Sequence, residues 1–395
     1  MNASIFRLPL LPSLLIATLC ILIPHAKADE PAPDIESAWF RNVRQLTSTD
    51  MGLDRSGEAY FSTDVRRICF QAFPTGQTDY QIYVMNLDGS GLKMVSTGTG
   101  ATTCSFFHPS GEKMIFAANH HDQRPAPEPE QPPNGGHPGG HPHASSGGHP
   151  SGGSPSADHA KPPAIPRHRS HAWKYYPGMD IFEYTFATGQ LRQLTSSGSY
   201  DAECAYSPDG RHIVFSSLRD GDQEIYICDA DGRNPRRITN APGGDGGPFF
   251  SPDGQHVVYR SDRTGTSNLQ IFINNVEGTD ERAITGNEAL HWCPFWHPSG
   301  KWIIFTHADF RGRPNFDLYL LRVDGSAMHR VTTDPAFDGL PVFSPDGRYL
   351  MWTSTRGGLE SPQVFLAEFT GLTPGGELNP RALAVSPPLP ALPTE

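Results

Sequence analysis

The sequence lacks an excess of positive charge. Its 395 residues include 31 Lys and Arg against 42 Asp and Glu, a net charge of -11. Nucleic acids and anionic membranes are bound through basic surfaces, so neither is expected as the main partner. Cysteine is also scarce: six widely spaced residues without a Cys-x-x-Cys pair indicate neither a disulfide framework nor structural zinc.

The N-terminal apolar run, Leu14 to Ile23, is shorter than the roughly 20 residues that span a bilayer. It follows Arg7 and precedes Ala26-Lys27-Ala28, a small-x-small cleavage site, so we interpret residues 1–28 as a signal peptide and expect a periplasmic or secreted protein. Five cysteines remain after cleavage, and we expect them to be buried core residues, with a single disulfide as the alternative: Cys69, Cys104, Cys204, Cys228 and Cys293.

With 40 Gly and 38 Pro, the chain is too rich in turn formers for long helices. One phrase recurs six times, complete as Ser-Pro-Asp-Gly or in variant form, and its copies begin at Ser62, His108, Ser207, Ser251, His297 and Ser344. The starting points lie 46, 99, 44, 46 and 47 residues apart, and the outlying spacing becomes ordinary once an insertion is removed. A period of this length is typical of a propeller or a solenoid.

Each repeat predicts four antiparallel strands and no helix. The turn is followed by an apolar run such as Ile213-Val214-Phe215, a strand such as Glu224 to Ile227, an Asp-Gly turn and a short Arg-x-apolar-Thr strand. The last repeat stops after Gln363 to Phe369, whereas Arg44 to Thr47 repeats the fourth strand before the first copy. The N-terminal strand should therefore complete the last blade and close a six-bladed, all-β propeller. An open β-solenoid, the alternative, gives no reason for this offset.

These repeats resemble the TolB-like family of WD-repeat-like propellers, whose blades combine an aromatic residue, Ser-Pro-Asp-Gly, an apolar strand, an Asp-Gly-ended strand and Arg-x-Leu-Thr. The resemblance covers residues 41–371 apart from an insertion at 121–172, after an N-terminal linker at 29–40. It implies the propeller fold and a binding role. TolB proper carries an α/β domain before its propeller, whereas here the first blade strand begins near Asn42, so a role in the Tol envelope system is not expected.

The common register of the repeats identifies residues on one face of the ring. Six residues before each turn lie Ser56, Thr102, Asp201, Asp245, His291 and Asp338, and twelve residues after it lie Pro74, His120, Arg219, Arg263, Asp309 and Arg356. Asp and Arg coincide in blades three, four and six, and we interpret them as structural pairs. An acidic channel mouth that binds a cation or a positively charged partner is the alternative.

Blades two and five lack this Asp–Arg pairing and have histidines at or near the same positions. Thr102 lies with His120 and His121, and His291 with His307, and imidazoles on one face could ligate a transition metal. The two blades lie across the ring from one another, so hydrogen-bonded loop histidines are the alternative. His108 and His297 replace the first turn residue on the opposite face, where we expect them to cap the turn.

The insertion at residues 121–172 contains eight histidines among many Pro and Gly and is expected to be a disordered loop. It lies between the second and third strands of blade two, hence on the same face as the residues above. Loose zinc or nickel binding is our hypothesis, and a solvated spacer the alternative; the candidate ligands are His120, His121, His137, His141, His143 and His149. The Pro-rich residues 372–395 should form an extended, mobile tail.

For function, the sequence offers no Gly-x-Ser-x-Gly, His-Glu-x-x-His or phosphate-loop motif. We therefore expect a monomeric, non-catalytic binding scaffold for a protein, peptide or polysaccharide. The alternative is a metal-dependent lyase or hydrolase that acts on a polysaccharide through the His and Asp residues of the channel face.

Zinc uptake tests the hypothesis about the insertion. Deleting residues 125–166 should remove most of the zinc bound by the full chain, because imidazole is a preferred zinc ligand and the deletion takes out most of the histidine tract. Titration calorimetry of both proteins measures the effect, and equal uptake would contradict the hypothesis.

Overall fold

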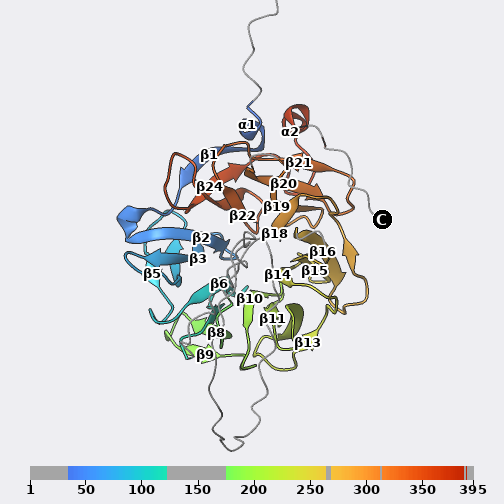
Figure 1. Ribbon diagram of the computed structural model, residues 1–395. Helices are drawn as coiled ribbons and strands as arrows, with labels where there is room; N and C mark the ends of the chain where they lie inside the picture. The colour runs from blue at the N-terminus through green and yellow to red at the C-terminus, as the bar shows by residue number, and fades with distance from the viewer. Residues whose placement is uncertain (1–33, 122–174, 264–267, 312–313, 387, 389–395) are drawn as a thin grey trace, which may run out of the picture. The chain divides into compact units, whose positions relative to one another are not determined.

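The computed structural model describes residues 34–121, 175–263, 268–311, 314–386 and 388. The described residues from Ile35 onward form one compact unit, in which six four-stranded antiparallel sheets surround a common centre (Figure 1). The predicted six-bladed, all-β propeller is confirmed. Within the described ranges, no helix is long and apolar enough to cross a membrane.

Blades one to five each contain four strands consecutive in sequence, and the innermost strand comes first. The blades are, in order, β2 (Leu53–Phe61), β3 (Arg67–Pro74), β4 (Gln81–Asn86) and β5 (Lys93–Met94); β6 (Thr102–Phe107), β7 (Lys113–Ala118), β8 (Asp180–Thr185) and β9 (Leu191–Gln193); β10 (Asp201–Tyr206), β11 (His212–Ser217), β12 (Glu224–Asp229) and β13 (Arg236–Arg237); β14 (Asp245–Phe250), β15 (His256–Ser261), β16 (Gln270–Asn275) and β17 (Arg282–Ala283); β18 (Leu290–Trp296), β19 (Trp302–Ala308), β20 (Phe316–Arg322) and β21 (Met328–Arg330).

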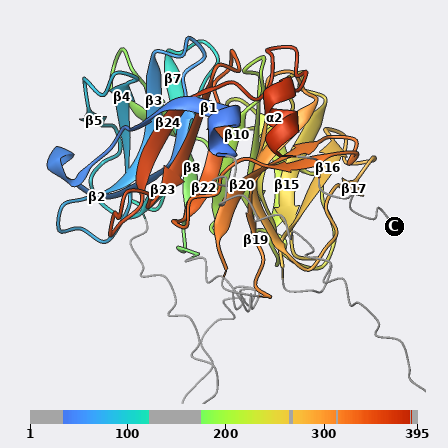
Figure 2. The same ribbon diagram turned by 90° about the horizontal axis from the view of Figure 1, so that it is seen from above.

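The sixth blade joins the two ends of the ring. It consists of β22 (Asp338–Phe343), β23 (Tyr349–Ser354), β24 (Gln363–Phe369) and the N-terminal β1 (Phe40–Gln45). Strand β1 runs antiparallel to β24, with Phe40 opposite Phe369 and Gln45 opposite Phe365 (Figure 2). The predicted closure by the N-terminal strand is therefore confirmed, and the strand begins four residues before the Arg-x-apolar-Thr motif.

A hydroxyl at the end of the fourth strand explains the recurring Thr of that motif. In every blade it accepts a hydrogen bond at 2.8–3.0 Å from a backbone N–H of the third strand, that of the third residue in blade five and of the second residue in the other blades. Blade six takes this hydroxyl from Thr47, which accepts from the Val364 N–H at 2.9 Å and donates to Gln363 Oε1 at 2.7 Å. Blade one uses Ser96 in the same role.

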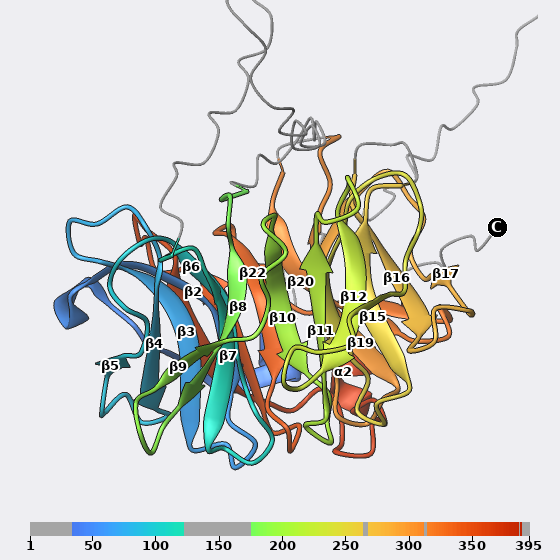
Figure 3. The ribbon, with the colours of Figure 1, turned by 90° about the horizontal axis from the view of Figure 1, so that it is seen from below.

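The recurring turn is held by its own side chains. In four copies the first-residue Ser hydroxyl donates to the Asp carboxylate two residues on, at 2.5–2.6 Å. In the other two, Nδ1 of His108 and of His297 lies 2.9 Å from the hydroxyl of Ser110 and Ser299. These two histidines therefore cap their turns, as the register suggests. Figure 3 shows the blades edge-on, with this turn face at one end of the strands and the opposite face, here called the mouth face, at the other.

The apolar runs after each turn form the second strands and are buried on both sides. Ile213, Val214 and Phe215 are fully buried, as are Ile303, Ile304 and Phe305. All five cysteines expected in the mature chain are free thiols, four of them buried and Cys293 half-buried. The core therefore depends on apolar packing between blades rather than on a disulfide.

The first part of the expected mobile tail is ordered. Helix α2 (Pro380–Val385) follows the N-cap Asn379, whose side chain accepts from the Arg381 N–H, and Pro380 at the first helical position fits this start. Ala382 is fully buried, and the carbonyl of Ser386 lies 2.7 Å from Nδ1 of the buried His329. The segment packs because it covers the apolar side of the last blades, near α1 (Glu36–Trp39) (Figure 1).

Ring closure can be tested at Thr47. Replacing Thr47 by Val leaves the buried Val364 N–H and the Gln363 amide without their partner, which should lower the free energy of unfolding by about 1–3 kcal/mol. Thr47→Ser keeps the hydroxyl, as Ser96 does in blade one, and should lose less. Thermal melting of both variants measures this; a Thr47→Val variant as stable as the wild type, with a destabilised Thr47→Ser variant, would show that the methyl group, not the hydroxyl, stabilises the closure.

Candidate functional site

The innermost strand of every blade bends at the same register position. Four residues before each turn, the backbone is left-handed, with φ between 50° and 60°, and the pairing with the second strand shifts there. These residues are Glu58, Cys104, Glu203, Gly247, Cys293 and Leu340. Such a bulge re-aims a side chain, and non-glycine residues adopt this conformation at a cost of about 1–3 kcal/mol each.

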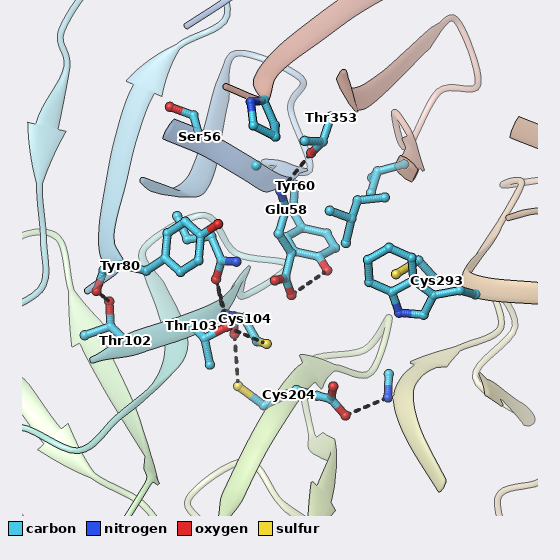
Figure 4. A pocket seen from close by; sticks show the side chains of 18 of the residues that line it. Ser56, Glu58, Tyr60, Tyr80, Thr102, Thr103, Cys104, Cys204, Cys293 and Thr353 are labelled. Atoms are coloured by element: carbon cyan, nitrogen blue, oxygen red, sulfur yellow. Dashed lines mark hydrogen bonds between the residues drawn. The ribbon is translucent and has the colours of Figure 1, made fainter. Parts of the chain in front are cut away.

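The six bulges surround a cavity of about 630 Å³ at the centre of the ring. Residues from all six blades line it, and Figure 4 shows Glu58, Tyr60, Cys104, Cys204 and Cys293 around one space. Tyr80, Tyr176, Tyr200 and Phe337 lie among its lining residues outside the innermost strands. The cavity therefore combines aromatic walls with a few polar groups, as small-ligand sites do.

Aromatic rings close the cavity toward the turn face. Two residues before their turns, Tyr60, Phe106, Phe249 and Phe295 come from four different blades, yet their ring centroids lie 5.0–6.3 Å apart. Blades one and four lie opposite one another in the ring, so the contact between Tyr60 and Phe249, at 5.6 Å, crosses the axis. The channel is thus a cup, open at the mouth face and floored by this aromatic cluster.

The three Asp and Arg coincidences form ion pairs at the mouth face. Arg219 donates to Asp201 at 3.0 Å, Arg356 to Asp338 at 2.7 Å, and Arg263 to Asp245. All three carboxylates are fully buried. Burial raises the pKa of Asp245 to about 6 in spite of Arg263.

The histidines of blades two and five do not converge. His291 Nε2 lies 3.1 Å from His307 Nδ1, and burial lowers the pKa of His307 to about 4, so the pair is neutral. His120 packs on Phe182 and on His121, with centroids 4.3 and 4.4 Å away, and burial lowers the pKa of His120. Thr102 donates to the carbonyl of Tyr80 at 2.9 Å.

Metal binding by these residues stays a hypothesis. Across the ranges that the structure describes, no group of three or more His, Cys, Asp or Glu side chains is arranged to hold a metal ion. The remaining candidate ligands lie in residues 122–174, outside the described part of the chain: His137, His141, His143 and His149.

Two carboxylates and two guanidinium groups that the repeat pattern does not identify line the cavity: Glu58, Glu203, Arg55 and Arg260. Arg260 of β15 donates to Glu203 of β10 at 2.6 Å, which joins blades three and four. Burial would raise the pKa of Glu203, but Arg260 and several hydrogen bonds lower it below its usual value. Burial raises the pKa of Glu58 to about 7, with Glu203 adding to the rise. Glu58 and Glu203 occupy the same register position, four residues before the turn, but Glu occurs there in only two of the six blades, so no single residue type marks the position.

Comparison with known proteins identifies the kind of propeller. Residues 177–313 match the family model of the TolB beta propeller domain. A TolB-type protein from Agrobacterium tumefaciens is 18% identical with a TM-score of 0.53, over 80% of this chain and 90% of that one. TolB from Acinetobacter baumannii is 17% identical with a TM-score of 0.51, over 82% of this chain and 65% of that one. An oligogalacturonate lyase from Vibrio parahaemolyticus is 14% identical, with a TM-score of 0.49 over 80% of this chain and 78% of that one.

The chain therefore carries a TolB-like propeller, which confirms the family resemblance of its repeats. At these identities the solved structures establish the fold alone.

The role of the mouth pairs can be tested at Asp245. Asp245→Asn removes the charge opposite Arg263, which keeps Glu281 as a partner, so the free energy of unfolding should fall by about 1–3 kcal/mol. Asp309→Asn, in the exposed pair with Arg311, is the control and should change it by less than about 1 kcal/mol. Thermal melting decides; an unchanged stability with lost partner binding would contradict the structural role.

Proposed function

We propose that the chain is an exported, non-catalytic binding scaffold that docks a protein or peptide partner across its mouth face. The observation that carries this proposal is the cup itself, which is walled by all six blades, open at one face and closed at the other. A polysaccharide is the alternative ligand.

The volume of the cup indicates that a partner would insert a single group into it. A volume of about 630 Å³ suits one side chain, chain end or small ring system rather than a folded domain. A macromolecular partner would rest on the mouth loops and insert one group into the cup, as buried anchors do in protein interfaces. The rigid sheets hold the loops in place, and the loops choose the partner.

Two further parts of the proposal rest on segments outside the described residues. The signal peptide at residues 1–28 would export the chain. The histidine-rich insertion joins β7 to β8 and so leaves the ring near Tyr176 and Met179, which line the cup. It would add to the partner surface there and bind zinc or nickel loosely.

An enzyme that acts on a polysaccharide is the second candidate. It is favoured by one observation: the cup holds two carboxylates with pKa values shifted in opposite directions, since burial raises the pKa of Glu58 to about 7 while Arg260 and hydrogen bonds lower that of Glu203 below its usual value. Such a division of roles is typical of acid–base sites. The channel-face His and Asp residues would assist a metal-dependent lyase or hydrolase.

Site-specific crosslinking in the exporting cells tests the scaffold proposal. The photocrosslinker p-benzoylphenylalanine in place of Tyr176, at the mouth, should give discrete partner adducts; in place of Tyr349, a half-buried tyrosine next to the turn of blade six, it should give none. Adducts that glycosidases shift would identify a polysaccharide. Equal labelling at both positions would refute docking at the mouth. Turnover of polysaccharides that needs added metal and fails in His120→Ala and His291→Ala variants would establish the enzyme instead.

A further inference from the structure

The charges that line the cup largely neutralise one another. Arg260 lies 2.6 Å from one oxygen of Glu203. The other oxygen of Glu203 accepts from the Ser216 hydroxyl at 2.8 Å and from the Gln223 amide and the Gly247 N–H at 2.9 Å. This pair is fully satisfied and offers little to a ligand. At the rim, the Arg55 guanidinium stacks over Phe73 and Tyr80.

Glu58 is the carboxylate without a cationic partner. Among the described residues its hydrogen-bond donors are the Tyr60 hydroxyl, at a long 3.4 Å, and the Cys104 thiol. The titratable groups that face it from the neighbouring strands are Tyr60, Cys69, Tyr80, Cys104, Glu203, Cys204, Arg260 and Cys293. Burial raises the pKa values of the thiols and tyrosines, so they are neutral. Of the two cations among the lining residues, Arg260 is paired with Glu203, and Arg55 is stacked on Phe73 and Tyr80 at the rim.

The aromatic floor, like the unpaired carboxylate of Glu58, is suited to an organic cation. Tyr60, Phe249 and Phe295 line the cup below Glu58, and Tyr80 and Tyr200 are also among its lining residues. Ring faces attract ammonium groups, most strongly where water is excluded. An unpaired carboxylate above aromatic rings therefore presents charge and surface to an organic cation, and the acidic chain, with a net charge of -11, favours its approach.

We propose that the cup binds an ammonium group carried on an apolar stem, with Glu58 as its counter-ion and the aromatic floor beneath it. This deepens the proposed function by naming the group that the partner inserts. The same chemistry occurs in a free aralkylamine and in the N-terminal ammonium of a polypeptide. The paired aspartates of the mouth do not supply the charge; the deeper, unpaired carboxylate does.

The proposal has a definite pH dependence. The cation needs ionised Glu58, whose pKa burial raises to about 7 in the empty cup. Below that pH the ligand must displace a proton, so its affinity should fall about tenfold for each pH unit. Above it the affinity should level off. Glu203 stays ionised throughout this range, because its pKa is lowered below the ordinary value, and so does not contribute to the slope.

Titration calorimetry with 2-phenylethylammonium tests this, with uncharged 2-phenylethanol as the matched ligand. At about pH 8, the amine should bind at least about tenfold more tightly than the alcohol, and Glu58→Gln should abolish that preference. Glu360→Gln removes an exposed carboxylate near the mouth and should leave binding unchanged. Proton release at about pH 6, measured in two buffers of different ionisation enthalpy, tests the wild-type chain independently of any variant.

These measurements distinguish a polypeptide N-terminus from a free amine as the ligand, and they distinguish failure of the ammonium site from failure of the scaffold function. A peptide with a free N-terminal Phe that binds more tightly than both the amine and its own N-acetylated form would assign the cup to a polypeptide end, and an amine that binds as tightly as the peptide would assign it to a small cation. No binding of either, no preference over the alcohol, or no proton release would overturn the inference. Mouth-specific crosslinks that persist in Glu58→Gln would then leave the scaffold proposal standing by itself.

Discussion

A left-handed residue in each innermost strand is the constraint on which the centre of this molecule depends. Six strands that converge on one axis leave little room, and a strand without a bulge would continue its regular alternation past that axis. The bulge shifts the register at one position per blade and turns one side chain toward the centre. Because it recurs at the same distance from the turn, five side chains and Gly247 lie at one level and form the wall of a single cup.

The ring explains why this strained level persists. Five of the six bulge residues are not glycine, so each carries a local cost that must be offset elsewhere. Closure by β1 pairs the last sheet edge, and the fourth-strand hydroxyls fix each third strand, so every blade is held on both sides. Opening the ring at β24 would release the blades that hold the bulges in register, and with them the cup. Strand β1 thus lies far from the cup, yet the cup depends on the ring closure that this strand provides.

The sequence alone predicts the parts of the fold that repeat, since turns, apolar runs and the Arg-x-apolar-Thr strand recur with a constant period. The same recurrence identifies Asp201, Asp245 and Asp338 with their arginines, and the structure shows them as buried carboxylates in ion pairs. The charged residues of the cup cannot be identified from recurrence. Glu58 and Glu203 share their register position with two cysteines, a glycine and a leucine, so no residue type signals it, and Arg260 reaches the cup from a second strand of a neighbouring blade. Backbone conformation, which the apolar pattern does not encode, brings these three together.

The pairing of Arg260 with Glu203 determines what the cup can bind. A buried ion pair contributes little net stability, because desolvation of two charges offsets their attraction. The pair joins blades three and four. It also satisfies one positive and one negative group of the lining, so neither is free to bind a ligand. What remains is Glu58 beside uncharged thiols, hydroxyls and aromatic rings, with Arg55 stacked on Phe73 and Tyr80 at the rim. Because Glu203 holds Arg260, Glu58 has no ion-pair partner among the described residues, and an unpaired carboxylate beside aromatic rings favours a cationic ligand.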